Sequence, residues 1–403
     1  MKRRWMVCLC LLWALGGLSR ADEIWLRYRV SASTEREIVN MGSQNMELSQ
    51  TLPVDWSAPE GAFNPVGATL KMGVDDQFKL LFTANKKDGK RDKLWVSRDG
   101  DWARAATYAA TTSSEDRGPN SSSFVPVLLK LKMPDGEVDY HAQIQLYSYD
   151  KGKRLSLNVG TACYYQDRIE LEGKTHRVAL VDANGNGRFD DSGATLRQCD
   201  WLMIDTNDDG RLDAYADEYK DVFPVGKYIK FGEKLYSLKV APDGAFFSIE
   251  PANCPTGKIR IQSDATDYKA TFFGENGRLI LDGKAGETTA PCGKYRIVSA
   301  TFYEPGKDRE SAWQLSSRSM SDLATSITVT ADKTAEIKIG PPLTAALQME
   351  KTGAQHAINL KLTGQAGEEY TIDRSRGRNN PPKLEIKRAG SNEPPRTLSF
   401  EYG

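Results

Sequence analysis

Alternating apolar and polar residues, in short runs that end at turn-forming residues, fill most of this chain. Apolar side chains occupy every second position of residues 125–133 and again of residues 138–146. Pro134, Asp135 and Gly136 separate the two runs. Because the side chains of a β-strand point alternately to its two faces, this pattern predicts two half-buried strands joined as a hairpin.

The same period of two residues predicts strands along the whole chain. We expect them at residues 23–30, 78–82, 155–159, 235–238, 246–249, 258–262, 268–273, 279–281, 295–303, 326–330, 335–339, 345–349, 357–362, 370–373, 384–387 and 398–402. No stretch has the apolar spacing that a long helix would need. The sequence therefore predicts an all-β, multidomain protein of antiparallel sheets and β-sandwiches with little helix.

Proline-rich breaks divide the chain, whose 403 residues are enough for several domains with separate cores. One break is residues 251–255 (PANCP), and another is residues 340–342 (GPP). The predicted organisation is a signal peptide (1–21), an N-terminal β domain (22–170), a loop-bearing β region either separate from it or continuous with it (171–251), a β-sandwich module (252–342) and a smaller one (343–403).

The first 21 residues have the composition of a secretory signal peptide. Lys2, Arg3 and Arg4 precede an apolar stretch at residues 6–18, and Ser19-Arg20-Ala21 has the small residues of a cleavage site. We therefore expect a secreted or periplasmic protein. No later stretch is long and apolar enough to predict a transmembrane segment. The 54 basic and 54 acidic residues balance, without a basic run that would indicate nucleic-acid binding.

Export would place the chain where disulfides can form. After the predicted cleavage site four cysteines remain: Cys163, Cys199, Cys254 and Cys292. An even number predicts at least one disulfide, with the pairing open. The alternative is four free, packed thiols.

Candidate chemistry is concentrated in two loops, each of which follows a four-residue apolar run (178–181 and 201–204). Each loop has oxygen-bearing residues at positions one, three, five and nine and a glycine at position six, which matches the first part of an EF-hand-like calcium loop. The expected ligands are Asp182, Asn184, Asn186, the Arg188 carbonyl and Asp190 in the first loop, and Asp205, Asn207, Asp209, the Arg211 carbonyl and Asp213 in the second. We therefore predict Ca²⁺ as the cofactor.

Both loops lack the bidentate glutamate of position twelve, where Gly193 and Ala216 stand. Spacing alone leaves Asp191, Asp217 or Glu218 as the residues that could complete the coordination. The alternative is a pair of ordinary Asx turns, in which the side chains bond only to the backbone. Formal charge predicts tighter binding by the second loop, which has three carboxylates at ligand positions where the first has two.

Residues 93–101 repeat the design of a strand followed by a polar loop. Ser97 would stand at position one and Trp102 where the glycine belongs, so this unit is expected to lack the metal.

The two loops resemble the DxDxDG calcium loops of thrombospondin type 3 repeats and dockerins. They are most similar to those of uncharacterised secreted bacterial proteins in which a strand enters a DxNxDG loop and another strand follows. A dockerin would have an acidic residue at position twelve and a helix after each loop, which this chain lacks. Residues 293–296 (GKYR) resemble β-sandwich modules of the carboxypeptidase-regulatory type. The resemblance implies a secreted β-protein that calcium stabilises.

The sequence shows no recognised catalytic motif. His141, His176 and His356 lie in three separate regions, and no nucleophile, P-loop or zinc-protease signature occurs. We therefore expect a non-enzymatic structural, adhesive or binding protein whose partner is an unknown cell-surface, protein or polysaccharide ligand. The alternatives are a carbohydrate-binding protein and a hydrolase with a carboxylate pair, whose residues have no fixed spacing in sequence.

Overall fold

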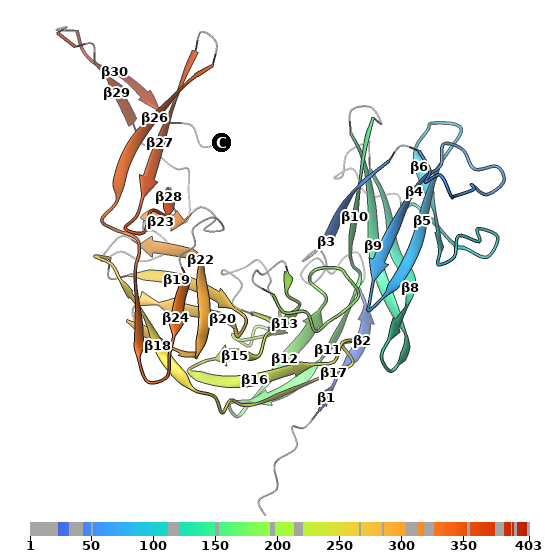
Figure 1. Ribbon diagram of the computed structural model, residues 1–403, viewed down its shortest axis with the longest axis horizontal. Helices are drawn as coiled ribbons and strands as arrows, with labels where there is room; N and C mark the ends of the chain where they lie inside the picture. The colour runs from blue at the N-terminus through green and yellow to red at the C-terminus, as the bar shows by residue number, and fades with distance from the viewer. Residues whose placement is uncertain are drawn as a thin grey trace, which may run out of the picture.

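The computed structural model describes residues 23–31, 43–49, 51–111, 121–149, 153–193, 198–212, 221–265, 267–283, 286–303, 313–317, 326–352, 355–374, 383–387, 389–390 and 393–400. Most of them form strands, which pair almost entirely antiparallel in several sheets (Figure 1) and confirm the all-β, multidomain prediction. The predicted signal peptide and Asp213 lie outside these residues. No helix within these ranges is long and apolar enough to cross a membrane.

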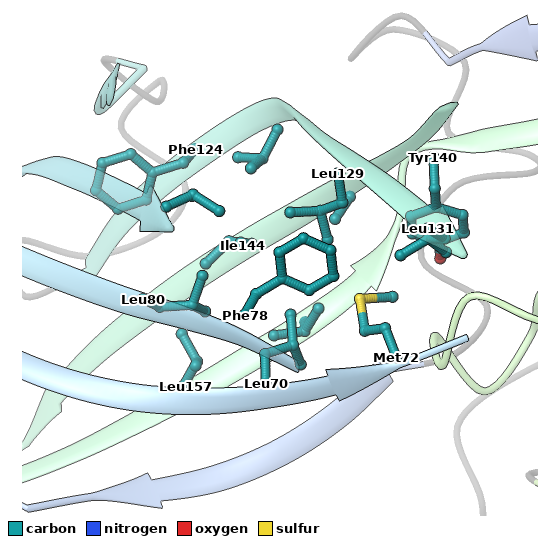
Figure 2. Packing of buried hydrophobic residues seen from close by; sticks show 14 of the residues in the cluster. Leu70, Met72, Phe78, Leu80, Phe124, Leu129, Leu131, Tyr140, Ile144 and Leu157 are labelled. Carbon is teal, nitrogen blue, oxygen red and sulfur yellow. The ribbon is translucent and has the colours of Figure 1, made fainter. Parts of the chain in front are cut away.

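Two four-stranded sheets pack face to face in the N-terminal part (Figures 1 and 2). The first sheet is a meander of β4 (Val66–Met72), β5 (Asp76–Ala84), β6 (Arg91–Ser97) and β7 (Ala106–Ala109). The second has the order β3 (Ser43–Leu48), β10 (Arg154–Thr161), β9 (Gly136–Tyr149) and β8 (Ser121–Met133). Inward-facing side chains such as Leu80, Leu129 and Ile144 are completely or almost completely buried between them. The predicted hairpin is β8–β9.

Two further sheets pack together beside this sandwich. The third sheet has the order β14 (Val222–Pro224), β13 (Trp201–Ile204), β12 (Lys174–Val181), β11 (Cys163–Leu171) and β2 (Arg27–Val30). The fourth has the order β1 (Ile24–Trp25), β17 (Phe246–Pro251), β16 (Lys234–Val240) and β15 (Tyr228–Phe231). Val178 and Ile204 of the third sheet pack against Leu238 and Phe247 of the fourth. Both predicted calcium loops extend from the third sheet.

The C-terminal part contains the remaining strands. One sheet is β21 (Glu287–Pro291), β18 (Thr256–Gln262) and β25 (Thr334–Lys338), in which β18 and β25 are parallel. The larger sheet has the order β20 (Gly277–Asp282), β19 (Tyr268–Gly274), β22 (Gly293–Tyr303), β23 (Trp313–Ser317), β28 (Glu369–Arg374), β27 (Gln355–Thr363) and β26 (Thr344–Thr352), with β24 (Ser326–Val329) also paired to β22. β29 (Lys383–Ile386) and β30 (Arg396–Ser399) form a hairpin.

Two of the predicted domain divisions run through shared sheets. The division at 170/171 falls at the end of β11, which pairs with both β2 and β12. The division at 342/343 falls between β23 and β28, which pair with each other and so belong to one sheet. No sheet among the described strands crosses residue 252.

The cysteines correct the disulfide prediction, because all four are free. Cys163 is buried, and its thiol lies 3.7 Å from the Thr161 hydroxyl. Cys199 is buried against the backbone of Gly193. Cys254 and Cys292 are half-buried and unbridged as well. The two buried thiols, Cys163 and Cys199, pack as small apolar side chains among their own neighbours.

Candidate metal centre

Loop one, residues 182–191, lies where four sheets meet. It leaves the third sheet at the end of β12 and hydrogen-bonds to the β4–β5 turn, to β3 and to the β16–β17 turn. The three contacts are Gly73 N to Asn186 O (2.7 Å), Gln44 Nε2 to Gly185 O (3.0 Å) and Phe189 N to Pro242 O (3.0 Å). Phe189 is buried in the core of the sandwich. The hydrogen bonds of loop one therefore connect its own sheet to the other three sheets of the N-terminal part.

Asp182 organises this loop from position one. Its carboxylate is fully buried and accepts hydrogen bonds from the backbone N–H groups of Gly185 (2.6 Å), Asn186 (3.3 Å) and Gly187 (2.6 Å). It also accepts one from the Tyr140 hydroxyl of β9 (2.8 Å). Because burial raises the pKa of Tyr140 well above its ordinary value, that hydroxyl stays protonated and donates.

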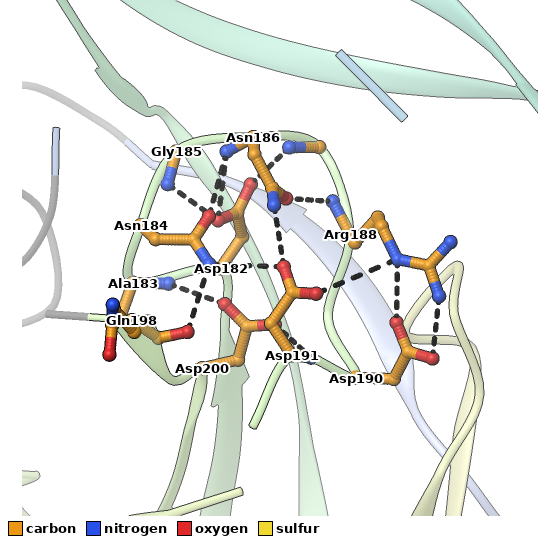
Figure 3. Close-up of polar contacts among 11 residues, drawn as sticks. Asp182, Ala183, Asn184, Gly185, Asn186, Arg188, Asp190, Asp191, Gln198 and Asp200 are labelled. Atoms are coloured by element: carbon orange, nitrogen blue, oxygen red, sulfur yellow. Dashed lines mark hydrogen bonds and ion pairs between the residues drawn. The ribbon is translucent and has the colours of Figure 1, made fainter. Parts of the chain in front are cut away.

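Asp200, which the loop spacing did not select, is the second buried carboxylate of the centre. It stands directly before β13 and accepts hydrogen bonds from Ala183 N (3.1 Å) and Asp191 N (2.8 Å), so it ties both ends of loop one together (Figure 3). Its exposed fraction is 0%, as is that of Asp182. Among the described residues, neither carboxylate forms an ion pair with a basic side chain.

The predicted ligand Asp190 does not face the other predicted ligands, whereas its neighbour Asp191 does (Figure 3). Asp190 turns away and pairs with the Arg188 guanidinium, at 3.0 and 2.8 Å. Asp191 also lies 3.7 Å from Nε of Arg188. It faces the other predicted ligands and accepts hydrogen bonds from Nδ2 of Asn184 (3.0 Å) and Nδ2 of Asn186 (2.5 Å). The structure therefore gathers Asp182, Asn184, Asn186, Asp191 and Asp200.

Position six requires glycine for two reasons. Gly187 has a φ of 85°, in the left-handed region that L side chains rarely adopt. A Cβ built on it would lie 2.5 Å from Leu131 Cδ1. Gly210 of the second loop has a similar φ of 78°, but nothing lies within 4 Å of its Cβ position. Both loops therefore contain a turn with a left-handed glycine at position six, and the turn is tightly packed in loop one.

The electrostatics of loop one reflect two carboxylates buried close together. Burial raises the pKa of Asp182 from 3.8 to about 6, although the N–H and O–H donors around it act in the opposite direction. Burial, followed by the negative charge of Asp182, raises the pKa of Asp200 well above its usual range. A proton or a bound cation would lower the electrostatic cost of these two buried carboxylates.

Loop two, described for residues 205–212, has one buried ligand residue. Asp205 is 3% exposed and its Oδ2 accepts a hydrogen bond from Gly210 N (2.9 Å). Its buried Oδ1 has no hydrogen-bond partner among the described residues. Asn207 and Asp209 are exposed, and Arg211 N donates to Asp209 Oδ1 (2.8 Å).

Asp221 stands to loop two as Asp200 stands to loop one. It directly precedes the next strand, β14, and is buried. Its Oδ1 accepts hydrogen bonds from N (3.0 Å) and Oγ1 (2.7 Å) of Thr206, the second residue of the loop. In loop one the second residue, Ala183, makes the equivalent bond to Asp200. An aspartate just before the following strand is the sequence signal that could have found both residues.

The charge count behind the predicted ranking of the loops changes with these positions. Asp182, Asp191 and Asp200 bring three carboxylates to loop one. Counted in the same way, buried Asp221 joins Asp205 and Asp209 at loop two. Asp213, the predicted ninth-position ligand of loop two, is outside the described residues. The ranking of the two loops therefore stays a prediction.

The related stretch at residues 97–101 forms a turn of the same type without the buried carboxylate. Ser97 Oγ accepts a hydrogen bond from Gly100 N (3.0 Å), the fourth position, as Asp182 does in loop one. Ser97 donates to Asp99 Oδ1 (2.9 Å), and Trp102 is buried. At position one, a neutral hydroxyl thus accepts the backbone hydrogen bond that a carboxylate accepts in loop one, and Asp99 accepts a second one from Asp101 N (2.9 Å).

The donors around loop one are oxygens. Within the described ranges, no three or more histidine, cysteine or acidic side chains form a ready metal-binding group. A calcium shell would therefore include amide and backbone carbonyl oxygens, as EF-hand-like loops do. Comparison with known proteins adds no family: no family model, curated protein or solved structure matches this chain.

Proposed function

We propose that this chain is an exported structural or binding protein whose N-terminal four sheets are held together by calcium at loop one, with a second site at loop two. The observation that carries the proposal is the buried pair Asp182 and Asp200. Burying one ionised carboxylate without a counter-ion is costly, and burying two side by side is more so. A bound cation would remove that cost.

The chemistry of the donors favours calcium. Calcium prefers six to eight hard oxygen ligands in a flexible shell, whereas magnesium requires a tighter octahedron and zinc prefers nitrogen or sulfur. The side chains that would hold the ion in loop one are Asp182, Asn184, Asn186, Asp191 and Asp200, together with the Arg188 carbonyl. The negative charge of this set suits a divalent cation.

A structural role follows from where loop one lies. Its hydrogen bonds reach three sheets besides its own, so an ion that fixes the loop would stabilise the packing of all four. The same burial argues against the hydrolase alternative at this pair, because a substrate could not reach carboxylates that are 0% exposed.

Paired substitutions at adjacent positions test this proposal. Thermal unfolding of the full chain would be followed in EDTA and in calcium for the wild type, Asp191→Asn and Asp190→Asn. We expect calcium to raise the wild-type midpoint, Asp191→Asn to lose most of that rise, and Asp190→Asn to keep it, because only Asp191 faces the other ligands. Equal behaviour of the two variants would contradict the assignment.

A further inference from the structure

The third sheet has an open groove that is lined mainly by arginine side chains. The groove has a volume of about 240 Å³ and lies over β2, β11 and β12. Its lining residues are Arg27, Arg29, Gln166, Asp167, Arg168 and Arg177. Four arginines and one aspartate give it a net charge of +3. β2 is the edge strand of the sheet, so the groove is open at one side.

Strand pairing holds these positive charges close together. Arg168 of β11 is directly opposite Arg177 of β12, and Gln166 of β11 is directly opposite Arg27 of β2. Like charges at directly opposite positions of an antiparallel pair destabilise a sheet. The arrangement therefore has a cost to the fold that an anion in the groove would relieve.

Acidic side chains on these strands do not neutralise the groove. Asp167 pairs with Arg27 at 3.2 Å. Glu170 lies further along β11 and accepts a hydrogen bond from the Thr175 hydroxyl. Arg29 and Arg168 are exposed, and neither forms an ion pair with any residue that the structure describes.

We propose that this groove binds an oxyanionic group: a phosphate, sulfate or carboxylate, either free or carried by a polysaccharide. The planar guanidinium presents several N–H donors in a fork that matches such oxyanions. A volume of about 240 Å³ is below the 300 Å³ or so of a typical small-molecule pocket, so it fits one charged group rather than a whole larger ligand.

Arg177 connects the groove to loop two. Its Nη2 donates to Gln166 Oε1 (3.2 Å) and its Nη1 donates to the Gly210 carbonyl (3.0 Å). Gly210 N in turn bonds to Asp205, the first predicted calcium ligand of loop two. Calcium in loop two would fix this arginine and add positive charge near the groove, so it should strengthen anion binding. This coupling, unlike the groove itself, rests on the proposed function.

Binding measurements on the full chain at low salt test the proposal. The probes are inorganic phosphate, heparin fragments as a sulfated polysaccharide and polygalacturonate fragments as a carboxylated one. The variants are Arg168→Gln and, as a control with the same loss of charge, Lys71→Gln on the exposed side of β4. We expect Arg168→Gln to weaken binding at least fivefold, Lys71→Gln to have less than a twofold effect, and added salt to weaken binding.

The outcomes separate the parts of the proposal. Binding of phosphate would assign a free oxyanion, and binding of one polysaccharide alone would assign its charged group. Absence of binding by all three probes, or equal loss in both variants, would overturn the groove as a site. A groove affinity that depends on Arg168 but is the same in EDTA and calcium would overturn the coupling to loop two, and calcium titration without anion would show separately whether the proposed function itself had failed.

Discussion

Acidification should stabilise the calcium-free protein, because the pKa of buried Asp182 is raised by folding. A carboxyl group with a pKa of about 6 in the folded state and an ordinary value of 3.8 in the unfolded chain binds its proton more tightly when folded. Its contribution to the free energy of unfolding is therefore fully present below the unfolded pKa and is lost as the pH rises through the folded pKa. Lowering the pH from 7 to 5 should add about 1 kcal/mol from this group alone.

Saturating calcium should cancel this gain in stability. The ion binds the deprotonated carboxylate, so a proton competes with it below the raised pKa. For one group with a pKa of about 6, the calcium affinity should fall about tenfold between pH 7 and pH 5. Because Asp200 also has a raised pKa, the measured fall should be at least as large.

Urea unfolding at pH 7, 6 and 5, in EDTA and in saturating calcium, measures both effects. We expect the unfolding free energy in EDTA to increase toward pH 5 and the extra stability from calcium to decrease. This pH range excludes more acidic conditions, in which carboxyl groups with a lowered pKa, such as Glu287, begin to lose their ion pairs. An unfolding free energy in EDTA that is unchanged or lower at pH 5 would contradict a raised pKa for the buried pair.

Two other predictions concern packing and thiol chemistry. Gly187→Ala should cost about 2–4 kcal/mol of stability, because it adds left-handed backbone strain to a clash with Leu131. The control Gly89→Ala should cost only about 1 kcal/mol, because Gly89 has a φ of 71° but nothing within 4 Å of its Cβ position. Equal losses in urea unfolding would mean that Leu131 moves aside without cost. Burial raises the pKa of the Cys163 thiol to about 11 and that of Cys199 to about 12, so mass spectrometry should find both alkylated much more slowly in the native protein than the other two cysteines, with all four reacting after unfolding. A cross-linked peptide pair in the non-reduced protein would contradict the free thiols.

Local strand structure could be predicted from the sequence, because alternation is a property of consecutive residues. The β8–β9 hairpin follows from its two alternating runs and the Pro134–Gly136 turn. The pairing of β1 with β17 and of β2 with β11 could not be predicted, because each joins segments more than a hundred residues apart. Those pairings bring the first strands of the chain into the sheets that surround the loops.

The candidate site was predictable to the same local extent. Loop spacing selects Asp182 and the position-six glycine, and in the structure the buried Asp182 carboxylate accepts a hydrogen bond from the N–H of Gly187, whose φ is positive. Arg188 pairs with both Asp190 and Asp191, and only Asp191 also accepts hydrogen bonds from Asn184 and Asn186. Loop spacing does not contain that information. Asp200 belongs to the candidate site because it directly precedes β13, nine residues beyond Asp191. The tertiary fold, and not the loop motif, therefore brings it to the site.

Calorimetric titration of calcium into the chelated full chain at neutral pH is the most direct test of calcium binding. We expect saturable binding that Asp182→Asn greatly weakens, with a dissociation constant on the order of 0.1–1 mM, the range of extracellular modules. At a hundred times that constant, each site should stabilise the fold by about 2.7 kcal/mol. Absence of any calcium-dependent heat, together with identical unfolding midpoints in calcium and in EDTA, would show that both loops are Asx turns and that the buried carboxylates are neutralised by protons instead.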